Sequence, residues 1–130
     1  MRLLLDVDVL IGALDGDDPH HNRARKLFTD WRDDRDSRVV SVVNLTEVLI
    51  APSSDASKLA VAREAIAALG VTVHQPNEAI GVEAARLRRR HPISLPDAYC
   101  IATAKHTGST LASFDQKIVK AAKREDVEVI

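Results

Sequence analysis

Residues Arg2 to Leu10, Arg-Leu-Leu-Leu-Asp-Val-Asp-Val-Leu, place two carboxylates inside an apolar run at the start of the chain. The three leucines do not alternate with polar residues, which is typical of a short strand buried on both faces. Asp6 follows at the carboxyl end of this predicted strand. In an open α/β sheet, ligands bind in the crevice outside the strand carboxyl ends, so Asp6 stands where a site would be built. Taken alone, such an acid can equally end the strand or cap a helix.

The composition favours one domain of helices layered on a sheet. The chain has 130 residues, of which 45% are hydrophobic and 3% aromatic, so aliphatic side chains and alanine must build the core. We therefore expect a single domain over residues 1–130. The single cysteine, Cys100, excludes an internal disulfide and a Cys-rich zinc site and is compatible with a reducing compartment. The sequence offers no signal peptide or membrane span, so we expect a cytoplasmic protein with no membrane partner.

Predicted strands and helices alternate along most of the chain. Strands are expected at 3–5, 38–43, 71–74, 109–113 and 127–130, and helices at 19–35, 44–51, 55–69, 76–91, 94–105 and 115–124. Such alternation predicts a parallel sheet with right-handed crossovers and helices on both faces. His20 and His21 are neighbours at a helix start and point about 100° apart, so we expect them on the exposed helix surface rather than on one metal.

Four acids share an apolar context, each just beyond a strand or in the expected first turn of a helix: Asp6, Glu47, Asp97 and Asp115. The carboxyl ends of parallel strands lie on one edge of the sheet, where three of these acids would meet. Asp97 joins them if its helix starts beside the same edge.

Helix capping is the competing interpretation of these acids. Ser94-Leu95-Pro96-Asp97 matches a capping box, Asn44-Leu45-Thr46-Glu47 resembles one, and Asp115 can cap the last helix. Capping does not explain why the acids stand among large apolar residues, where an uncompensated charge is costly. A divalent cation bound between the acids does explain this placement, because it neutralises their charges. An all-oxygen site indicates Mg²⁺ or Mn²⁺. A water activated by such an ion can attack phosphorus, which predicts phosphodiester hydrolysis.

These segments resemble the PIN-domain nucleases, and in particular the toxins of VapBC toxin–antitoxin pairs. Leu5 to Leu10 resembles the family's opening, usually Asp-Thr-Asn or Asp-Thr-Ser, and residues 44–49 resemble the segment that bears its glutamate, here Glu47. Residues 95–104 resemble the Leu-x-x-Asp-Ala segment that bears Asp97. Residues 111–115 resemble the Thr-x-Asp strand end that bears Asp115, with Ser113 in place of threonine.

Two residues depart from the family's opening motif. Val7 replaces a hydroxyl residue, and Asp8 puts a charge where the family often has Asn or Ser. Asp8 is either an outer-shell ligand or a helix cap, and we slightly favour the cap.

The resemblance implies a three-layer α/β/α sandwich around a parallel sheet of four to five strands. It implies an endoribonuclease that depends on Mg²⁺ or Mn²⁺, a VapB-type antitoxin that blocks the site, and a homodimer. The residues that would bind metal and catalyse are Asp6, Glu47, Asp97 and Asp115, with Asp8 and Ser113 as candidates for the outer shell.

Basic residues could supply a local RNA-binding patch although the net charge is only −1. They cluster at one helix end and along the last helix, and we expect RNA contacts from Arg86, Arg88, Arg89, Arg90 and Lys117. Cations at helix carboxyl ends are also favoured by the helix dipole, whatever the function.

Two other functions remain open at this point. Asp6-Val7-Asp8-Val9 could be the nucleophile motif of a haloacid-dehalogenase-like phosphatase, which also needs a phosphate-binding lysine and a late acidic pair where Asp115 stands alone. Alternatively, the acids could bind a metal without cleavage in a receiver-like interaction module, which would also want a strand-end lysine.

Overall fold

A parallel sheet forms the centre of the computed structural model, which describes residues 1–31 and 35–130. In this part of the chain the sheet has four strands, β1 (Arg2–Leu5), β2 (Ser37–Ser41), β3 (Val71–His74) and β4 (Thr110–Ala112), in the order β3-β2-β1-β4. Leu4 of β1 lies opposite Val39 of β2 on one side and Leu111 of β4 on the other. The three leucines of β1 are completely buried, as their unbroken apolar run predicts.

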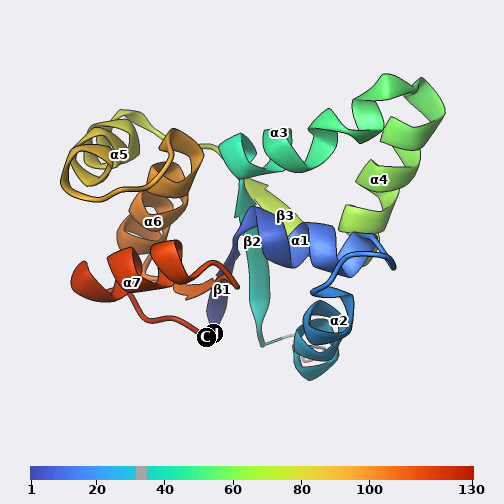
Figure 1. The fold of residues 1–130 in the computed structure, drawn as a ribbon, viewed down its shortest axis with the longest axis horizontal. Coiled ribbons are helices and arrows are strands. Elements are labelled where there is room, and N and C mark those ends of the chain that lie inside the picture. The colour runs from blue at the N-terminus through green and yellow to red at the C-terminus, as the bar shows by residue number, and fades with distance from the viewer. Residues whose placement is uncertain (32–34) are drawn as a thin grey trace.

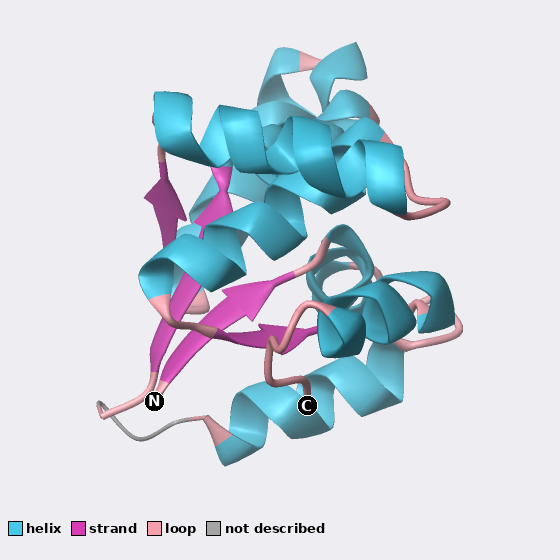
Figure 2. Ribbon diagram, turned by 90° about the vertical axis from the view of Figure 1, so that its left-hand side faces the viewer, coloured by secondary structure: helices cyan, strands magenta, loops and turns pink. Residues whose placement is uncertain are grey.

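Helices cover both faces of the sheet (Figures 1 and 2). They are α1 (Val7–Leu14), α2 (His21–Asp30), α3 (Val42–Ile50), the short 3₁₀ helix η1 (Pro52–Ser54), α4 (Ala56–Ala68), α5 (Glu78–Arg90), α6 (Leu95–Thr107) and α7 (Gln116–Arg124). None of these helices is long and apolar enough to cross a membrane.

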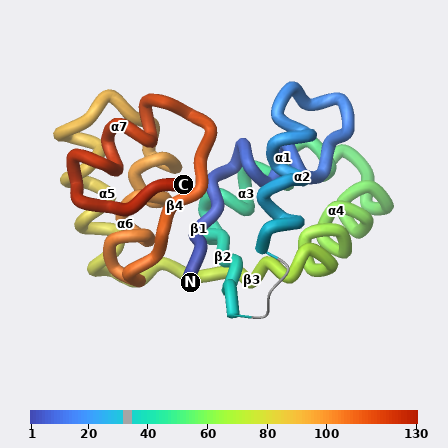
Figure 3. Tube along the Cα trace, turned by 90° about the horizontal axis from the view of Figure 1, so that it is seen from below, coloured from blue at the N-terminus to red at the C-terminus, as the bar shows by residue number. Residues whose placement is uncertain are grey.

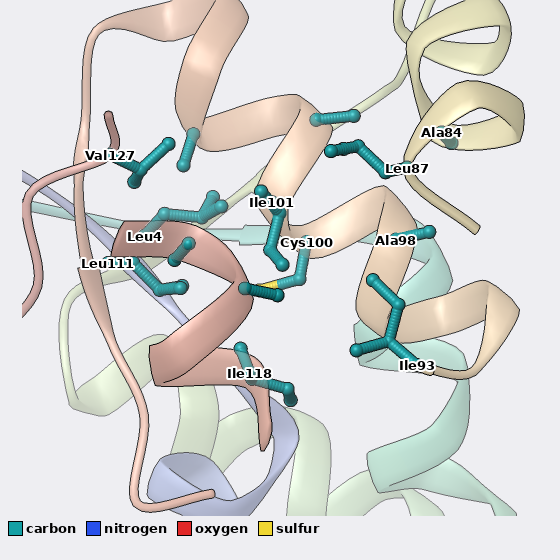
Figure 4. Close-up of a cluster of buried hydrophobic side chains, with 14 of the residues drawn as sticks. Leu4, Ala84, Leu87, Ile93, Ala98, Cys100, Ile101, Leu111, Ile118 and Val127 are labelled. Carbon is teal, nitrogen blue, oxygen red and sulfur yellow. The ribbon is translucent and has the colours of Figure 1, made fainter. Parts of the chain in front are cut away.

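Alternation along β1 divides the core into two halves. Leu4 points into a cluster with residues of α5, α6 and α7, among them Leu87, Ile101 and Ile118 (Figure 4). Leu3 and Leu5 point to the opposite face and pack with residues of α1, α2, α3 and α4. The three-layer α/β/α architecture expected from the sequence is therefore confirmed.

Several predicted boundaries are wrong. Helix α2 begins at His21 rather than at 19, and the predicted continuation of that helix over 32–34 lies outside the described residues. Helix α3 begins at Val42, two residues before the predicted start, because the Ser41 hydroxyl accepts a hydrogen bond from the backbone N–H of Val43 at 3.3 Å and caps the helix. The β-branched pair 42–43 therefore extends a helix rather than a strand.

The predicted fifth strand at 127–130 does not form as a strand. This segment runs beside β4 (Figure 3), where Leu111 and Val129 make an isolated parallel bridge. Within the described residues, two backbone hydrogen bonds join this segment to β4, from Leu111 N to Glu128 O at 2.8 Å and from Ile130 N to Leu111 O at 2.9 Å. The pairing is too short to make a ladder.

Candidate active site

Asp6 ends β1 and is only 3% exposed. Its backbone N–H donates to the carbonyl of Ala112 at 3.0 Å, which continues the pairing of β1 with β4. Its side chain accepts two hydrogen bonds, Oδ1 from the backbone N–H of Val7 at 2.8 Å and Oδ2 from the hydroxyl of Ser113 at 2.7 Å. Burial and then the charge of Asp8 raise the pKa of Asp6 to about 7, although both hydrogen bonds oppose this rise. Without a cation, this carboxyl is therefore poised between its neutral and charged forms at neutral pH.

The segment after β4 binds to Asp6 through Ser113. The hydroxyl of Ser113 donates to Asp6 and accepts a hydrogen bond from the backbone N–H of Asp115 at 3.1 Å. Asp115 itself is exposed and caps α7, since Oδ1 accepts from the backbone N–H of Lys117 at 2.8 Å. The predicted cap at this position is confirmed, and Ser113 fixes the turn that carries it.

Asp8 is not a helix cap, so the interpretation favoured from the sequence is wrong. Asp6 caps α1, and Asp8 lies in its first turn, where Oδ2 accepts a hydrogen bond from the backbone N–H of Phe114 at 3.0 Å. The other oxygen of Asp8 is buried and has no hydrogen-bond partner. Burial raises the pKa of Asp8, while the Phe114 hydrogen bond and the charge of His20 lower it. Asp8 thus ties the start of α1 to the segment that follows β4.

Glu47 projects from α3 towards the same edge of the sheet. Because α3 starts at Val42, Glu47 lies in its second turn rather than its first. Its Oε1 is buried without a hydrogen-bond partner, and burial and then the charge of Asp97 raise its pKa.

Asp97 lies in the first turn of α6, where the predicted capping box is confirmed. The backbone N–H of Ser94 donates to Oδ2 of Asp97 at 3.1 Å, and the backbone N–H of Asp97 donates to the Ser94 hydroxyl at 3.3 Å. The box predicted at 44–47 is wrong, since Asn44 lies inside α3 and is completely buried.

Electrostatic coupling shows which acids the fold brings together. After burial, the charge of Asp97 also raises the pKa of both Asp6 and Glu47. The fold therefore brings together three acids from three separate parts of the chain. Helices α3 and α6 lie side by side at this edge (Figure 1), joined by a hydrogen bond of 3.3 Å from Asn44 Nδ2 to the carbonyl of Pro96. The charge of Asp115 instead contributes to raising the pKa of Asp8, for which burial is the largest cause. The sheet edge therefore gathers the predicted acids, with Asp115 at the exposed side.

The donor chemistry of this edge suits a hard divalent cation. Among the described residues, no group of three His, Cys, Asp or Glu side chains is placed to hold a metal ion as it stands. However, the available ligands are all oxygen, and those of Asp8 and Glu47 include buried atoms without partners. Mg²⁺ and Mn²⁺ prefer such ligands and retain several waters, so they need few direct protein contacts. We conclude that these residues fit such an ion.

The predicted basic cluster separates into paired and unpaired residues. Arg86 contacts Glu83 at 3.8 Å, and Arg90 contacts Glu83 at 3.5 Å and Glu125 at 3.2 Å. Arg88 and Arg89 are exposed and form no ion pair within the described chain. Lys117 is also exposed, at the start of α7 beside Asp115. Arg88, Arg89 and Lys117 are therefore available to an external anion, whereas Arg90 is engaged in the fold.

A group of residues at the start of α2 was not predicted from the sequence. His20 is half-buried rather than exposed, with its ring centroid 4.8 Å from that of Phe114, and its charge lowers the pKa of Asp8. Arg23 places its guanidinium carbon 4.5 Å from the centroid of the same ring. These contacts join segments more than ninety residues apart, which no local pattern could predict.

Solved structures of the same fold cover almost the whole chain. FitAcB from Neisseria gonorrhoeae is 22% identical, with 98% of this chain and 96% of that chain covered at a TM-score of 0.73. VapC20 from Mycobacterium tuberculosis, described as a sarcin-ricin loop cleaving toxin, is 17% identical, with 92% and 94% covered at a TM-score of 0.75. VapBC-1 from nontypeable Haemophilus influenzae is 17% identical, with 100% and 97% covered at a TM-score of 0.74.

Family membership follows from the sequence itself. None of the curated proteins matches the chain significantly. The family model described as PIN domain matches residues 3–124, which run from within β1 to the last residue of α7. The chain therefore belongs to the PIN domain family.

Proposed function

We propose that this chain is an endoribonuclease that uses Mg²⁺ or Mn²⁺, and that it acts as the toxin of a toxin–antitoxin pair. The observation that carries the proposal is the burial of Asp6 at the carboxyl edge of the sheet, where Asp97 raises its pKa and that of Glu47. Such mutual repulsion is relieved when a divalent cation binds between the carboxylates. PIN-domain membership and the description of VapC20 as a sarcin-ricin loop cleaving toxin support the same reaction.

In this proposal Asp6, Glu47 and Asp97 hold the cation, and Asp115 contributes from the exposed side. The bound ion would supply a water of lowered pKa for attack on phosphorus. Ser113 keeps the Asp6 carboxylate oriented through its 2.7 Å hydrogen bond. Asp8 acts beside these ligands by fixing the Phe114 backbone and therefore the turn before Asp115.

The RNA backbone would be bound by the exposed cations Arg88, Arg89 and Lys117, which form no ion pair with any residue that the structure describes. Arg86 and Arg90 were expected to share this role, but their contacts with Glu83 reduce what they can offer. Since each phosphate contact releases counterions, binding should weaken as salt rises.

The partner and the setting are inferred from the relatives. A structure from Klebsiella pneumoniae, 21% identical to this chain, is described as a toxin–antitoxin complex, and VapBC2 from Rickettsia felis is described as bound to a DNA fragment. By likeness, we propose a VapB-type antitoxin that blocks the acid edge, a homodimer, one domain over residues 1–130 and action in the cytoplasm.

Incubation of the purified protein with total RNA tests the activity. We expect cleavage with Mg²⁺ or Mn²⁺, none in excess chelator, and none with Asp6→Asn. Asp30→Asn is the matched control, because it makes the same chemical change on the exposed surface of α2. Equal cleavage in chelator would contradict the proposal.

A phosphatase reaction is the alternative to exclude. It requires a lysine at the phosphate, and in the described part of the chain no lysine hydrogen-bonds or ion-pairs with Asp6 or Asp8. Release of inorganic phosphate from a small phosphomonoester, with RNA left intact, would favour that alternative instead.

A further inference from the structure

Asn44 is a fully buried polar residue that the proposed mechanism does not use. It lies in α3, three residues before Glu47, and its exposed fraction is 0%. Residues three apart on a helix share a face, so Asn44 and Glu47 lie on the same side of α3. Because Ser41 caps this helix, the side chain of Asn44 is not needed at its start. A different role must account for an amide in the core.

The two ends of the amide have different surroundings. Nδ2 donates to the carbonyl of Pro96 at 3.3 Å, directly before Asp97, and this bond joins α3 to the first turn of α6. Oδ1 is buried and has no hydrogen-bond partner among the residues that the structure describes. An unsatisfied buried acceptor costs about 1–3 kcal/mol, so few such atoms persist without a ligand or water. Oε1 of Glu47, on the same helix face, is also buried without a hydrogen-bond partner in the described part of the chain.

We propose that Asn44 is a positioning residue of the carboxylate site. Its NH₂ group holds the segment that carries Asp97 against α3, and its oxygen accepts a hydrogen bond from the water shell of the hydrated divalent cation. This inference rests on the proposed function, since it assumes that a cation binds at the acid edge.

The neutral amide is what makes this role distinctive. Asp6, Glu47 and Asp97 already bring three carboxylates to this edge, so a further carboxylate would add repulsion to the cation-free protein. An amide adds an oxygen acceptor and no charge. Asn44→Asp and Asn44→Leu should therefore shift cation binding in opposite directions, whereas a purely structural amide would leave it unchanged.

Thermal melts in chelator and along a Mg²⁺ series, repeated with Mn²⁺, test the inference on the full chain. Asn44→Leu keeps the side-chain size and should melt within a few degrees of wild type in chelator. It should need about 10-fold more Mg²⁺ for the same rise in Tm, as expected when a group that supports a metal site is lost. Asn44→Asp should melt lower in chelator and gain a larger rise from Mg²⁺. Asn22→Leu, on the exposed surface of α2, is the control.

Two outcomes overturn the role of Asn44 alone. One is an Asn44→Leu variant with the Mg²⁺ response of wild type. The other is an Asn44→Asp variant whose Mg²⁺ response is unchanged from wild type, and this outcome decides the question if the leucine variant does not fold. A wild-type chain that neither cation stabilises overturns the metal site of the proposed function and this role with it. A wild-type chain that is stabilised by Mg²⁺ but leaves RNA intact overturns only the ribonuclease activity.

Discussion

Replacing Asp6 by asparagine should stabilise the cation-free protein, and by more at pH 7 than at pH 5. Burial first, and then the charge of Asp8, raise the pKa of Asp6 from 3.8 to about 7, so the folded chain holds a proton that the unfolded chain releases. Stability falls with rising pH wherever the native state binds more protons. The full slope is about 1.4 kcal/mol per pH unit, and it diminishes as the pH approaches the folded pKa, so this carboxyl lowers the free energy of unfolding by about 2 kcal/mol between pH 5 and pH 7. Asparagine does not titrate, so the variant lacks this loss.

The pH dependence is more informative than the stability at a single pH. Asparagine keeps one acceptor oxygen, so it weakens one of the two hydrogen bonds that Asp6 accepts from Val7 and Ser113. That loss is about 1 kcal/mol and does not change with pH. The titration of Glu47 occurs in both proteins and cancels to first order, and the repulsion between Asp8 and Asp6 is already part of the raised pKa of Asp6. The difference between variant and wild type therefore isolates the proton on Asp6.

Denaturant and thermal unfolding in chelator at pH 5, 6 and 7 measure this difference. The gap in Tm should widen by about 8 °C from pH 5 to pH 7, given the unfolding entropy of a chain of this size. Mg²⁺ at pH 7 should then raise the Tm of wild type and narrow the gap. Asp30→Asn, at an exposed position, should show no such trend. A gap that stays constant with pH would mean that Asp6 remains ionised, and the burial argument for a cation at this edge would fail.

Three further changes separate structural from functional contacts. Ser94→Ala removes the capping hydroxyl of α6 and should lower stability by about 1 kcal/mol while the Mg²⁺-dependent rise in Tm stays as in wild type. Arg88→Ala with Arg89→Ala should reduce the salt dependence of RNA binding, measured by titration at several salt concentrations, by about 0.7 per lost phosphate contact, whereas Arg90→Ala should mainly lower Tm. Glu125→Gln should lower the free energy of unfolding by about 1–3 kcal/mol at pH 7. Burial raises the pKa of Glu125, but its hydrogen bonds with His91 and Lys105 lower it by more, so the folded pKa lies below the ordinary value of 4.5. The ionised Glu125 therefore stabilises the fold fully above pH 4.5. As the pH falls through the folded pKa, the difference in stability between the variant and wild type should disappear.

Much of the fold could be predicted from the sequence because local signals and tertiary packing agree. The leucines of β1 form an unbroken apolar run, and the structure buries them between two helical layers. The start of α3 was predicted wrongly, because Val42 and Val43 favour a strand by propensity, whereas the structure caps the helix with Ser41 directly before them. The segment 127–130 has the composition of a strand and lies beside β4, but its pairing there is limited to one bridge.

Residues that depend on long-range contacts were predicted less well. Asn44 seemed a helix cap because its spacing to Glu47 is that of a capping box, and only the true start of α3 shows that it is buried. His20 was expected on the surface, since nothing near it in the sequence indicates that Phe114 would cover its ring. In both cases, the informative partner lies on another element of the fold.

Capping and metal binding are not alternatives for these acids, although the sequence alone sets them against each other. Asp6, Asp97 and Asp115 each cap or stabilise the start of a helix, and all three helices begin at the same edge of the sheet. Helix N-termini carry partial positive charge, so they stabilise carboxylates that would otherwise repel one another. The hydrogen bonds that cap the helices also fix where the carboxylates lie before any cation binds. We therefore expect cation binding to stabilise an acid edge that is already formed, rather than to fold it.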